Sequence, residues 1–245
     1  MTISTLMNAA DRKRRSSKKT KIGLGFFKDE TYSIASIIQM LFKFKSTQAA
    51  YQTLAKMERD GLIKRAQINM IYGRSLTVWG ITEMGLHYAD DIDAPLQKRK
   101  IFEPSKIKPI MMQHKFDLQI ARIKGEQHGW TNWVPGELLG RRIENAKYPD
   151  AVAKNQAGET IAIELERTIK SRKRYAEILV SHLMQRKNNH WEKIYYLSPN
   201  EDLAARIKRA FHSIEQARHN RKRFKVTPEH LEPFYFYSFN DNNWL

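Results

Sequence analysis

Apolar and polar positions change their period along the chain, and the changes predict a succession of helices and strands. Residues 32–44 have isoleucines, Leu41 and Phe42 on one side, which predicts a helix. A second helix is predicted over residues 46–59, between a Ser-Thr cap and Gly61, which suits the left-handed position after a helix. Strands beginning at Leu62 and covering residues 76–81 then precede a short helix capped by Thr82.

The second half of the chain shows a similar mixture of periods. Helices are predicted over residues 112–123, 171–185 and 201–218, and strands over 130–134, 137–142, 193–197 and 233–239, with a hairpin over 147–167. A helix, a meander of strands and then alternating helices and strands indicate an α/β sandwich. The whole chain is therefore predicted to be a mixed α/β protein.

The hairpin carries the strongest candidate chemistry. Alternating apolar residues in its second strand place Glu164 and Glu166 together on the opposite face, and a turn over residues 155–158 would put Asp150 opposite Glu164. Carboxylates so close repel one another unless a cation lies between them. Oxygen ligands of this kind suit Mg²⁺ or Mn²⁺, so the pattern predicts a metal-dependent phosphodiesterase.

Breaks in the pattern divide the chain into four parts. Residues 1–28 are basic and have little to bury, which predicts a flexible arm that lies along DNA or remains a solvated tail. Residues 29–90 form the predicted N-terminal domain, 91–109 have the composition of a linker, and 110–245 form the predicted second domain.

The formal net charge of +17 favours a polyanionic partner, and nucleic acid is the commonest one. A ribosome-associated or merely soluble basic protein is the alternative. The sequence has no cysteine, which excludes disulfides and cysteine-based zinc sites or nucleophiles. No apolar run reaches the roughly 20 residues of a membrane span, and no apolar secretory segment is visible. We therefore expect a cytoplasmic protein without a membrane partner.

Residues 54–63, read as L-A-K-M-E-R-D-G-L-I, precede a basic hairpin and then I-T-E-M-G. This block resembles the winged helix-turn-helix domains of DNA-binding regulators. The resemblance implies that the helix over 46–59 enters the major groove and that a wing around Tyr72 contacts the backbone or the minor groove. The implied DNA contacts are Gln48, Tyr51, Gln52, Lys56 and Arg74. A winged helix that binds protein is the alternative.

Pro149-Asp150 followed by an E-x-E strand end resembles the PD-(D/E)XK restriction-endonuclease-like superfamily. That family carries a Lys two residues after the acidic residue, where this chain has Glu166. Some members have a second Glu there, and others place the Lys in the next helix. Lys170 is the candidate for such a displaced Lys.

A longer pattern adds W-V-P-G-E-L, Y-P-D and I-E-L-E-R-T-I-K-S-R-K-R-Y after His114. It is similar to the replication-relaxation proteins, which include the MOBC-class relaxases of mobilisable plasmids. The resemblance implies site- and strand-specific nicking of supercoiled DNA at a transfer origin, without a covalent tyrosine adduct. It also implies a coupling protein and accessory relaxosome proteins as partners. The implied active-site positions are Glu137, Asp150, Glu164, Glu166 and Lys170.

In this interpretation Asp150 and Glu164 bind Mg²⁺ or Mn²⁺ together with the Leu165 carbonyl, and Glu137 binds a second metal through water. Glu166 or Lys170 orients or deprotonates the attacking water. His114 is a candidate phosphate contact, and His182 is expected in the core. The basic run after the site is expected to contact the DNA backbone through Arg167, Lys170, Arg172, Lys173 and Arg174. A second run is either another backbone contact or a soluble loop, and comprises Arg218, Arg221, Lys222, Arg223 and Lys225.

Other interpretations stay open. Asp150 can simply begin a turn, and Glu164 and Glu166 can form the solvated face of an edge strand. The main rival function is a non-enzymatic DNA-binding regulator of plasmid replication or transcription with an inactive nuclease fold. A further possibility is a transposase-like or restriction endonuclease that cuts both strands, which generally requires a dimer.

Overall fold

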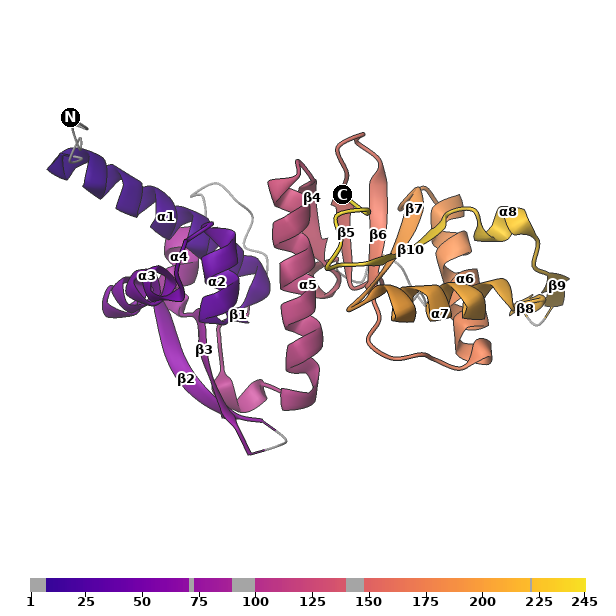
Figure 1. Cartoon of the computed structure of the whole chain (residues 1–245), viewed down its shortest axis with the longest axis horizontal. Helices are drawn as coiled ribbons and strands as arrows, with labels where there is room; N and C mark the ends of the chain where they lie inside the picture. The colour runs from indigo at the N-terminus through magenta and orange to yellow at the C-terminus, as the bar shows by residue number, and fades with distance from the viewer. Residues whose placement is uncertain (1–7, 71–72, 90–99, 140–147, 221) are drawn as a thin grey trace. The chain divides into compact units, whose positions relative to one another are not determined.

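The computed structural model describes residues 8–70, 73–89, 100–139, 148–220 and 222–245. It is a mixed α/β structure whose strands form three sheets, as predicted in outline (Figure 1). The chain divides into two compact units, Met1–Met112 and Gln113–Leu245, called unit 1 and unit 2 below. None of the helices in the described ranges is both long and apolar enough to cross a membrane.

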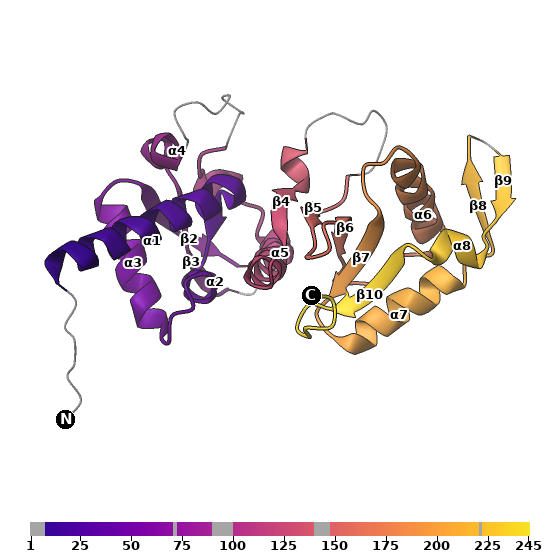
Figure 2. The same cartoon turned by 90° about the horizontal axis from the view of Figure 1, so that it is seen from above.

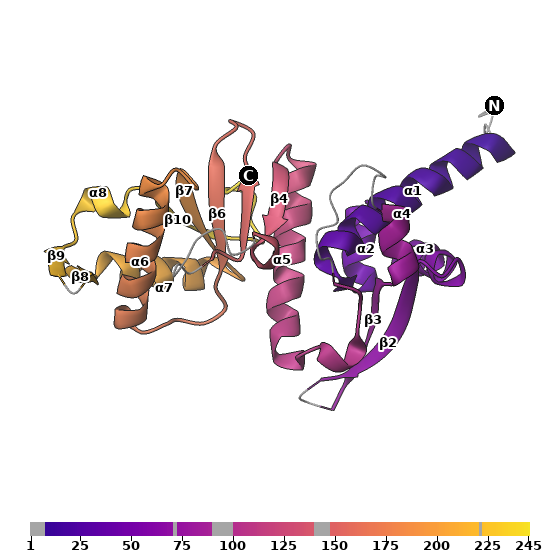
Figure 3. The ribbon, with the colours of Figure 1, turned by 180° about the vertical axis from the view of Figure 1, so that it is seen from behind.

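Unit 1 combines helices with a small antiparallel sheet of order β1-β3-β2. Figure 3 shows the hairpin of β2 and β3. Its elements are α1 (Ala9–Glu30), β1 (Tyr32–Ser33), α2 (Ala35–Leu41), α3 (Thr47–Arg59), β2 (Ile63–Asn69), β3 (Ser75–Ile81), α4 (Glu83–Ala89) and the short 3-10 helix η1 (Pro104–Lys106).

In the described part of the predicted arm the chain is helical from Ala9 onward, because residues 9–28 belong to α1. Asn8 caps this helix, because its side chain accepts a hydrogen bond from the Asp11 N–H at 2.8 Å. The basic N-terminal half is largely exposed, whereas Leu24, Phe26 and Phe27 are buried. The apolar C-terminal end therefore anchors the helix. The basic half has no apolar pattern in its sequence from which a helix could be predicted.

The predicted helix over residues 32–44 is shorter in the structure. Tyr32 and Ser33 instead form β1, in which Tyr32 pairs with Gly80 and Ser33 with Trp79 of β3. Pairing with a strand far along the chain overrides the local helical pattern. The other elements predicted for this unit are present, and Gly61 has a φ of 72°, as its place after α3 requires.

The predicted linker over residues 91–109 is partly wrong. Residues 90–99 lie outside the described residues, but Phe102 is fully buried in unit 1. Its N–H donates to the carbonyl of Ile81 at 2.9 Å. The segment after Lys100 therefore packs on the β-sheet of unit 1, which ends at Met112.

Unit 2 is built around a five-stranded sheet of order β10-β7-β6-β5-β4. The helix α5 (Pro109–Gln127) leads into it, followed by β4 (Thr131–Pro135), the 3-10 helix η2 (Gly136–Leu138), β5 (Ala151–Lys154), β6 (Thr160–Leu165), α6 (Arg172–Lys187), β7 (Lys193–Ser198), α7 (Glu201–His212), the hairpin β8 (Gln216–His219) and β9 (Lys222–Lys225), α8 (Pro228–Leu231) and β10 (Phe234–Ser238).

The sheet of unit 2 is covered on both faces (Figure 2). The first three strands, β4, β5 and β6, form an antiparallel meander. Strand β7 then pairs in parallel with β6, and β10 pairs in parallel with β7. One face packs against α5 through residues such as Leu118 and Ala121, and the other packs against α6 and α7 through Ile178 and Ile207. Strand β6 lies at the centre of this three-layer arrangement.

Two predicted elements of unit 2 differ from the structure. Residues 136–138 form η2, so no strand continues from β4 in the described part of this segment, and residues 140–147 lie outside the described residues. The helix predicted over residues 201–218 ends at His212, and the basic run beyond it forms the hairpin of β8 and β9, apart from Arg221, which is not among the described residues. Neither hairpin strand shows the apolar alternation by which a strand is recognised from sequence.

Candidate active site in unit 2

The hairpin of β5 and β6 places Asp150 opposite Glu164. Ala151 pairs with Ile163 in the antiparallel register, so the preceding Asp150 faces Glu164 across the two strands. The turn is closed by Asn155, whose carbonyl accepts the Gly158 N–H at 3.0 Å. The Leu165 N–H also donates to Asp150 Oδ2 at 2.8 Å. The hairpin register predicted for Asp150 and Glu164 is confirmed.

Glu164 and Glu166 are buried rather than solvated. Strand β6 has a neighbour on each side, and the exposed fractions of Glu164 and Glu166 are 4 % and 5 %. The interpretation of these residues as the water-facing side of an edge strand is therefore wrong. Buried carboxylates require partners, because removal of a charge from water costs on the order of several kcal/mol per ion.

His114 of α5 connects that helix to the end of the hairpin. Its Nε2 lies 3.1 Å from the Leu165 carbonyl oxygen and 3.3 Å from Asp150 Oδ2. Both partners are acceptors, so Nε2 carries the proton and its N–H is directed between them. Asp150 Oδ2 and the Leu165 carbonyl oxygen therefore both face the Nε2–H group of His114.

The electrostatics of His114 reflect this position. Burial by itself lowers the pKa of His114, but the hydrogen bond and charge of Asp150, the Leu165 carbonyl and the charge of Glu164 outweigh it, so the net pKa is raised from 6.5. Both Glu164 and Asp150 also act on Tyr196, whose pKa is raised well above 10 first by burial and then by these carboxylates. The negative charge of Asp150 and Glu164 is therefore concentrated in one small region.

Glu164 has a buried partner in α6. Its Oε1 lies 3.0 Å from His182 Nε2, and the side chains are 5 % and 1 % exposed. His182 packs between Trp191 and Phe234, with ring centroids at 5.5 and 6.0 Å. The expectation that His182 belongs to the core is confirmed, but its contact with Glu164 was missed because it depends on how α6 packs on the sheet.

Glu166 and Lys170 form an ion pair directly after β6. The Glu166 N–H also donates to the Leu197 carbonyl of β7 at 2.8 Å, which fixes the backbone where the strand ends. Lys170 lies in the loop before α6 (Arg172–Lys187) and not in that helix, so its role as the displaced Lys stays a prediction. The neighbouring Arg167 pairs with the buried Asp117 of α5, so its guanidinium contributes to holding α5 against the hairpin.

Glu137 lies on η2 and, unlike Glu164 and Glu166, is not buried. Its side chain is 39 % exposed, and Oε1 lies 3.4 Å from Lys115 Nζ. The backbone next to it is close to the site, because the Gly136 N–H donates to the Asp150 carbonyl at 2.8 Å. Glu137 is thus near the strand that carries Asp150, but its described carboxylate contact is with Lys115.

The donor chemistry of this region fits a hard divalent cation. Asp150 Oδ2 and the Leu165 carbonyl converge on His114 Nε2, and Glu164 is the cross-strand neighbour of Asp150. Oxygen donors of these types are the ones that Mg²⁺ and Mn²⁺ prefer. Across the ranges that the structure describes, no cluster of three or more His, Asp or Glu side chains is already arranged to hold a metal. Glu164 would have to reorient from His182 for all of these donors to act together.

The predicted DNA contacts of unit 1 lie on the exposed side of α3. Gln48, Tyr51, Gln52 and Lys56 are exposed, whereas Ala50, Leu54 and Met57 of the same helix are buried. Arg74 is exposed just before β3, and Tyr72 lies outside the described residues. The division of α3 into a buried and an exposed side is the one that its apolar spacing predicts.

The basic residues of α1 lie beside this surface of α3. Lys56 Nζ donates to Ser16 Oγ at 2.7 Å, and Lys19 Nζ lies 4.5 Å from the centroid of the Phe44 ring. Arg12, Arg15 and Lys19 share with Gln52 and Lys56 the lining of a hollow of about 340 Å³. Sequence reasoning assigned these cations to a separate arm and missed that they join the α3 surface.

The basic residues of α6 that are predicted to contact the DNA backbone differ in the acidic residues they pair with. Arg174 Nη1 lies 2.9 Å from Glu177 Oε2, and Arg172 Nη2 lies 3.6 Å from Glu215 Oε1, both at the surface. Lys173, between them, lines a separate hollow with residues of the second basic run.

Comparison with known proteins adds no assignment: no protein-family model matches the chain, and no curated protein or solved structure is significantly similar to it.

Proposed function

We propose that this protein is a metal-dependent DNA endonuclease that nicks one strand at a specific site, as a relaxase does at a plasmid transfer origin. The observation that carries the proposal is the hairpin register that sets Asp150 opposite the buried Glu164, with the Leu165 carbonyl directed to the same region. Structural needs alone rarely explain two carboxylates so placed, since their repulsion must be offset.

The order of elements in unit 2 supports a nuclease of the PD-(D/E)XK type. A helix, an antiparallel meander, a second helix and a parallel strand surround the carboxylates, as in the resemblance stated from the sequence. In unit 1, helices α2 and α3 followed by the hairpin of β2 and β3 support a winged helix that recognises DNA. The exposed side of α3 and the adjacent cations of α1 would supply its contacts.

Asp150, Glu164 and the Leu165 carbonyl would hold Mg²⁺ or Mn²⁺, which when bound would lower the pKa of a water and offset charge on the phosphate. Glu166, held by Lys170, would orient the attacking water or accept its proton. His114 would have to release its contacts with Asp150 and the Leu165 carbonyl before a cation could bind these oxygens. Its N–H could then donate to a phosphate oxygen. No residue in this scheme forms a covalent bond to DNA.

One observation favours a second function, that of a DNA-binding regulator without cleavage. Glu164 is bonded to the buried His182, and Glu166 is paired with Lys170, so both glutamates already have structural partners. In such a regulator the DNA surface of unit 1 would retain its role, while the carboxylates of unit 2 would only stabilise the fold.

Nicking of a supercoiled plasmid that carries the DNA flanking the gene tests the proposal. Conversion to the open circle with Mg²⁺ or Mn²⁺, but not with chelator, at one mapped position and without attached protein is the expected result. Asp150→Asn should abolish it, while Asp202→Asn, which alters an exposed carboxylate of α7, should not. Site-specific binding without cleavage, in the presence of cell extract as a source of accessory proteins, would favour the regulator. A covalent adduct would overturn the proposed mechanism, and a linear product would indicate a double-strand endonuclease.

A further inference from the structure

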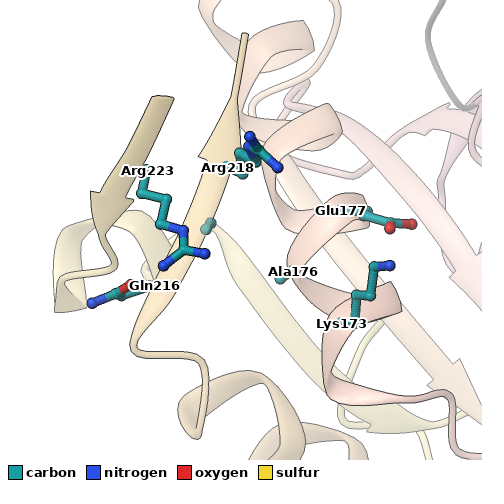
Figure 4. Close-up of a pocket in the computed structure, with 7 residues that line it drawn as sticks. Lys173, Ala176, Glu177, Gln216, Arg218 and Arg223 are labelled. Atoms are coloured by element: carbon teal, nitrogen blue, oxygen red, sulfur yellow. The ribbon is translucent and has the colours of Figure 1, made fainter. Parts of the chain in front are cut away.

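A second basic surface lies on unit 2, where α6 meets the hairpin of β8 and β9. A hollow of about 650 Å³ opens between them, and its lining comprises Lys173, Ala176, Glu177, Gln216, Ala217, Arg218 and Arg223 (Figure 4). Two basic runs that are far apart in the sequence, one in α6 and one in the hairpin, therefore contribute to a single concave surface.

The strand register brings positive charges together. Arg218 of β8 is the direct cross-strand partner of Arg223 of β9. Like charges opposite each other on neighbouring strands destabilise a sheet. Lys173 adds another cation to the same hollow from α6. Cations gathered in this way favour the binding of an anion among them.

The lining carries three cationic side chains and one carboxylate, that of Glu177. Glu177 accepts from Arg174 at 2.9 Å, a contact with a guanidinium outside the lining. Lys173, Arg218 and Arg223 are all exposed, so their charges are accessible to a large ligand. The electrostatic character of the hollow is therefore positive.

The lining also indicates which part of a nucleic acid fits. Its wall includes the small side chains Ala176 and Ala217, which leave space between the cations. Among the described residues no aromatic side chain lines the hollow, so this wall offers no stacking platform for unpaired bases. Flexible cations around small side chains suit the sugar–phosphate backbone, which is bound through charge and without base recognition.

We propose that this hollow, formed by α6 and the hairpin of β8 and β9, binds the phosphodiester backbone of DNA. The proposal rests on the proposed action on DNA and adds an anchoring surface to unit 2 that is distinct from the carboxylate site. Helix α6, which contributes Lys173 to the hollow, begins a few residues after Glu166, so this side of the hollow follows the carboxylate hairpin directly in the sequence.

The test compares two double variants of the full-length protein on duplex DNA over a range of salt concentrations. Arg218→Ala with Arg223→Ala removes the cross-strand pair. Arg206→Ala with Arg209→Ala, two exposed arginines of α7 outside the hollow, removes the same charge and serves as the control. Binding of the hollow variant should fall on the order of tenfold at ~0.15 M salt, with a salt slope smaller by about 2, while the control should lose far less.

Conservative replacement at both arginines separates the effect of charge from an effect on folding. The double variant Arg218→Lys with Arg223→Lys keeps both positive charges, so it should retain most of the binding and the salt slope. Equal losses in the hollow and control variants would overturn the proposed backbone site while leaving the nuclease proposal intact, provided that wild-type protein binds and nicks. Absence of DNA binding by the wild-type protein would overturn both.

Discussion

His182 Nε2 lies 3.0 Å from Glu164 Oε1, and both side chains are almost completely removed from water. The proposed metal ligand Glu164 is therefore also a structural partner of α6. Because His182 Nδ1 has no hydrogen-bond partner among the described residues, the imidazole depends on Glu164 for its polar contact. Loss of Glu164 consequently affects folding as well as any chemistry.

Removal of either member of the Glu164–His182 pair should destabilise the protein by about 1–3 kcal/mol or more, because the remaining buried polar group loses this hydrogen bond. Glu164→Ala, His182→Ala and the double variant, compared by urea unfolding, should show that the second removal costs much less than the first. Additive losses would show that the two residues stabilise the fold independently.

Asp150 should behave differently from Glu164, because it is less buried and its side-chain exposure is 29 %. Asp150→Asn retains an oxygen that can accept the Leu165 N–H, so we expect the variant to fold and to bind DNA but not to nick it. Gel-shift binding and plasmid nicking measured on one preparation check this. Combined loss of binding and thermal stability would assign Asp150 a folding role instead.

His114 and a divalent cation should compete for Asp150 and the Leu165 carbonyl. His114→Ala is expected to lower the unfolding temperature in chelator, because it removes the contact between α5 and the hairpin. Addition of Mn²⁺ should then raise the unfolding temperature of His114→Ala more than that of wild type. A smaller Mn²⁺ effect in the variant would show that His114 is itself a metal ligand.

The parts that sequence predicted well depend on neighbours along the chain. The register of Asp150 and Glu164 follows from apolar alternation and a short turn, which together determine a hairpin locally. The contacts of Glu164 with His182, of His114 with Leu165 and of Phe102 with Ile81 depend on long-range packing, which periodicity does not encode. The basic composition of α1 and of the β8–β9 hairpin concealed regular structure, because charged residues in both elements outnumber those that pack.

The turn of the β5–β6 hairpin provides a pH-dependent contribution to stability. A hydrogen bond from Lys193, then one from Asn155, lowers the pKa of Glu159 below its ordinary 4.5. Its contribution is therefore present above pH 4.5 and is lost as pH falls through the lower folded-state pKa. Glu159→Gln should cost at most about 1 kcal/mol at pH 7, because the pair is partly exposed, and the difference from wild type should vanish in acid. A constant difference from pH 7 into acid would exclude ionisation of Glu159 as its source.

Gly136 connects backbone packing to the position of Asp150, because its N–H donates to the Asp150 carbonyl at 2.8 Å. A Cβ added at Gly136 would lie 2.0 Å from the Pro149 carbonyl oxygen, a backbone atom that cannot rotate away. Gly136→Ala should therefore cost about 1–3 kcal/mol or more and displace Asp150 from its place opposite Glu164. Nicking should fall more than DNA binding, since the α3 surface belongs to unit 1. Gly25→Ala is the matched control, because its added Cβ meets nothing within 4 Å and a helical Ala is favoured over Gly. Unchanged stability and nicking in Gly136→Ala would show that β4 and η2 do not position the carboxylate.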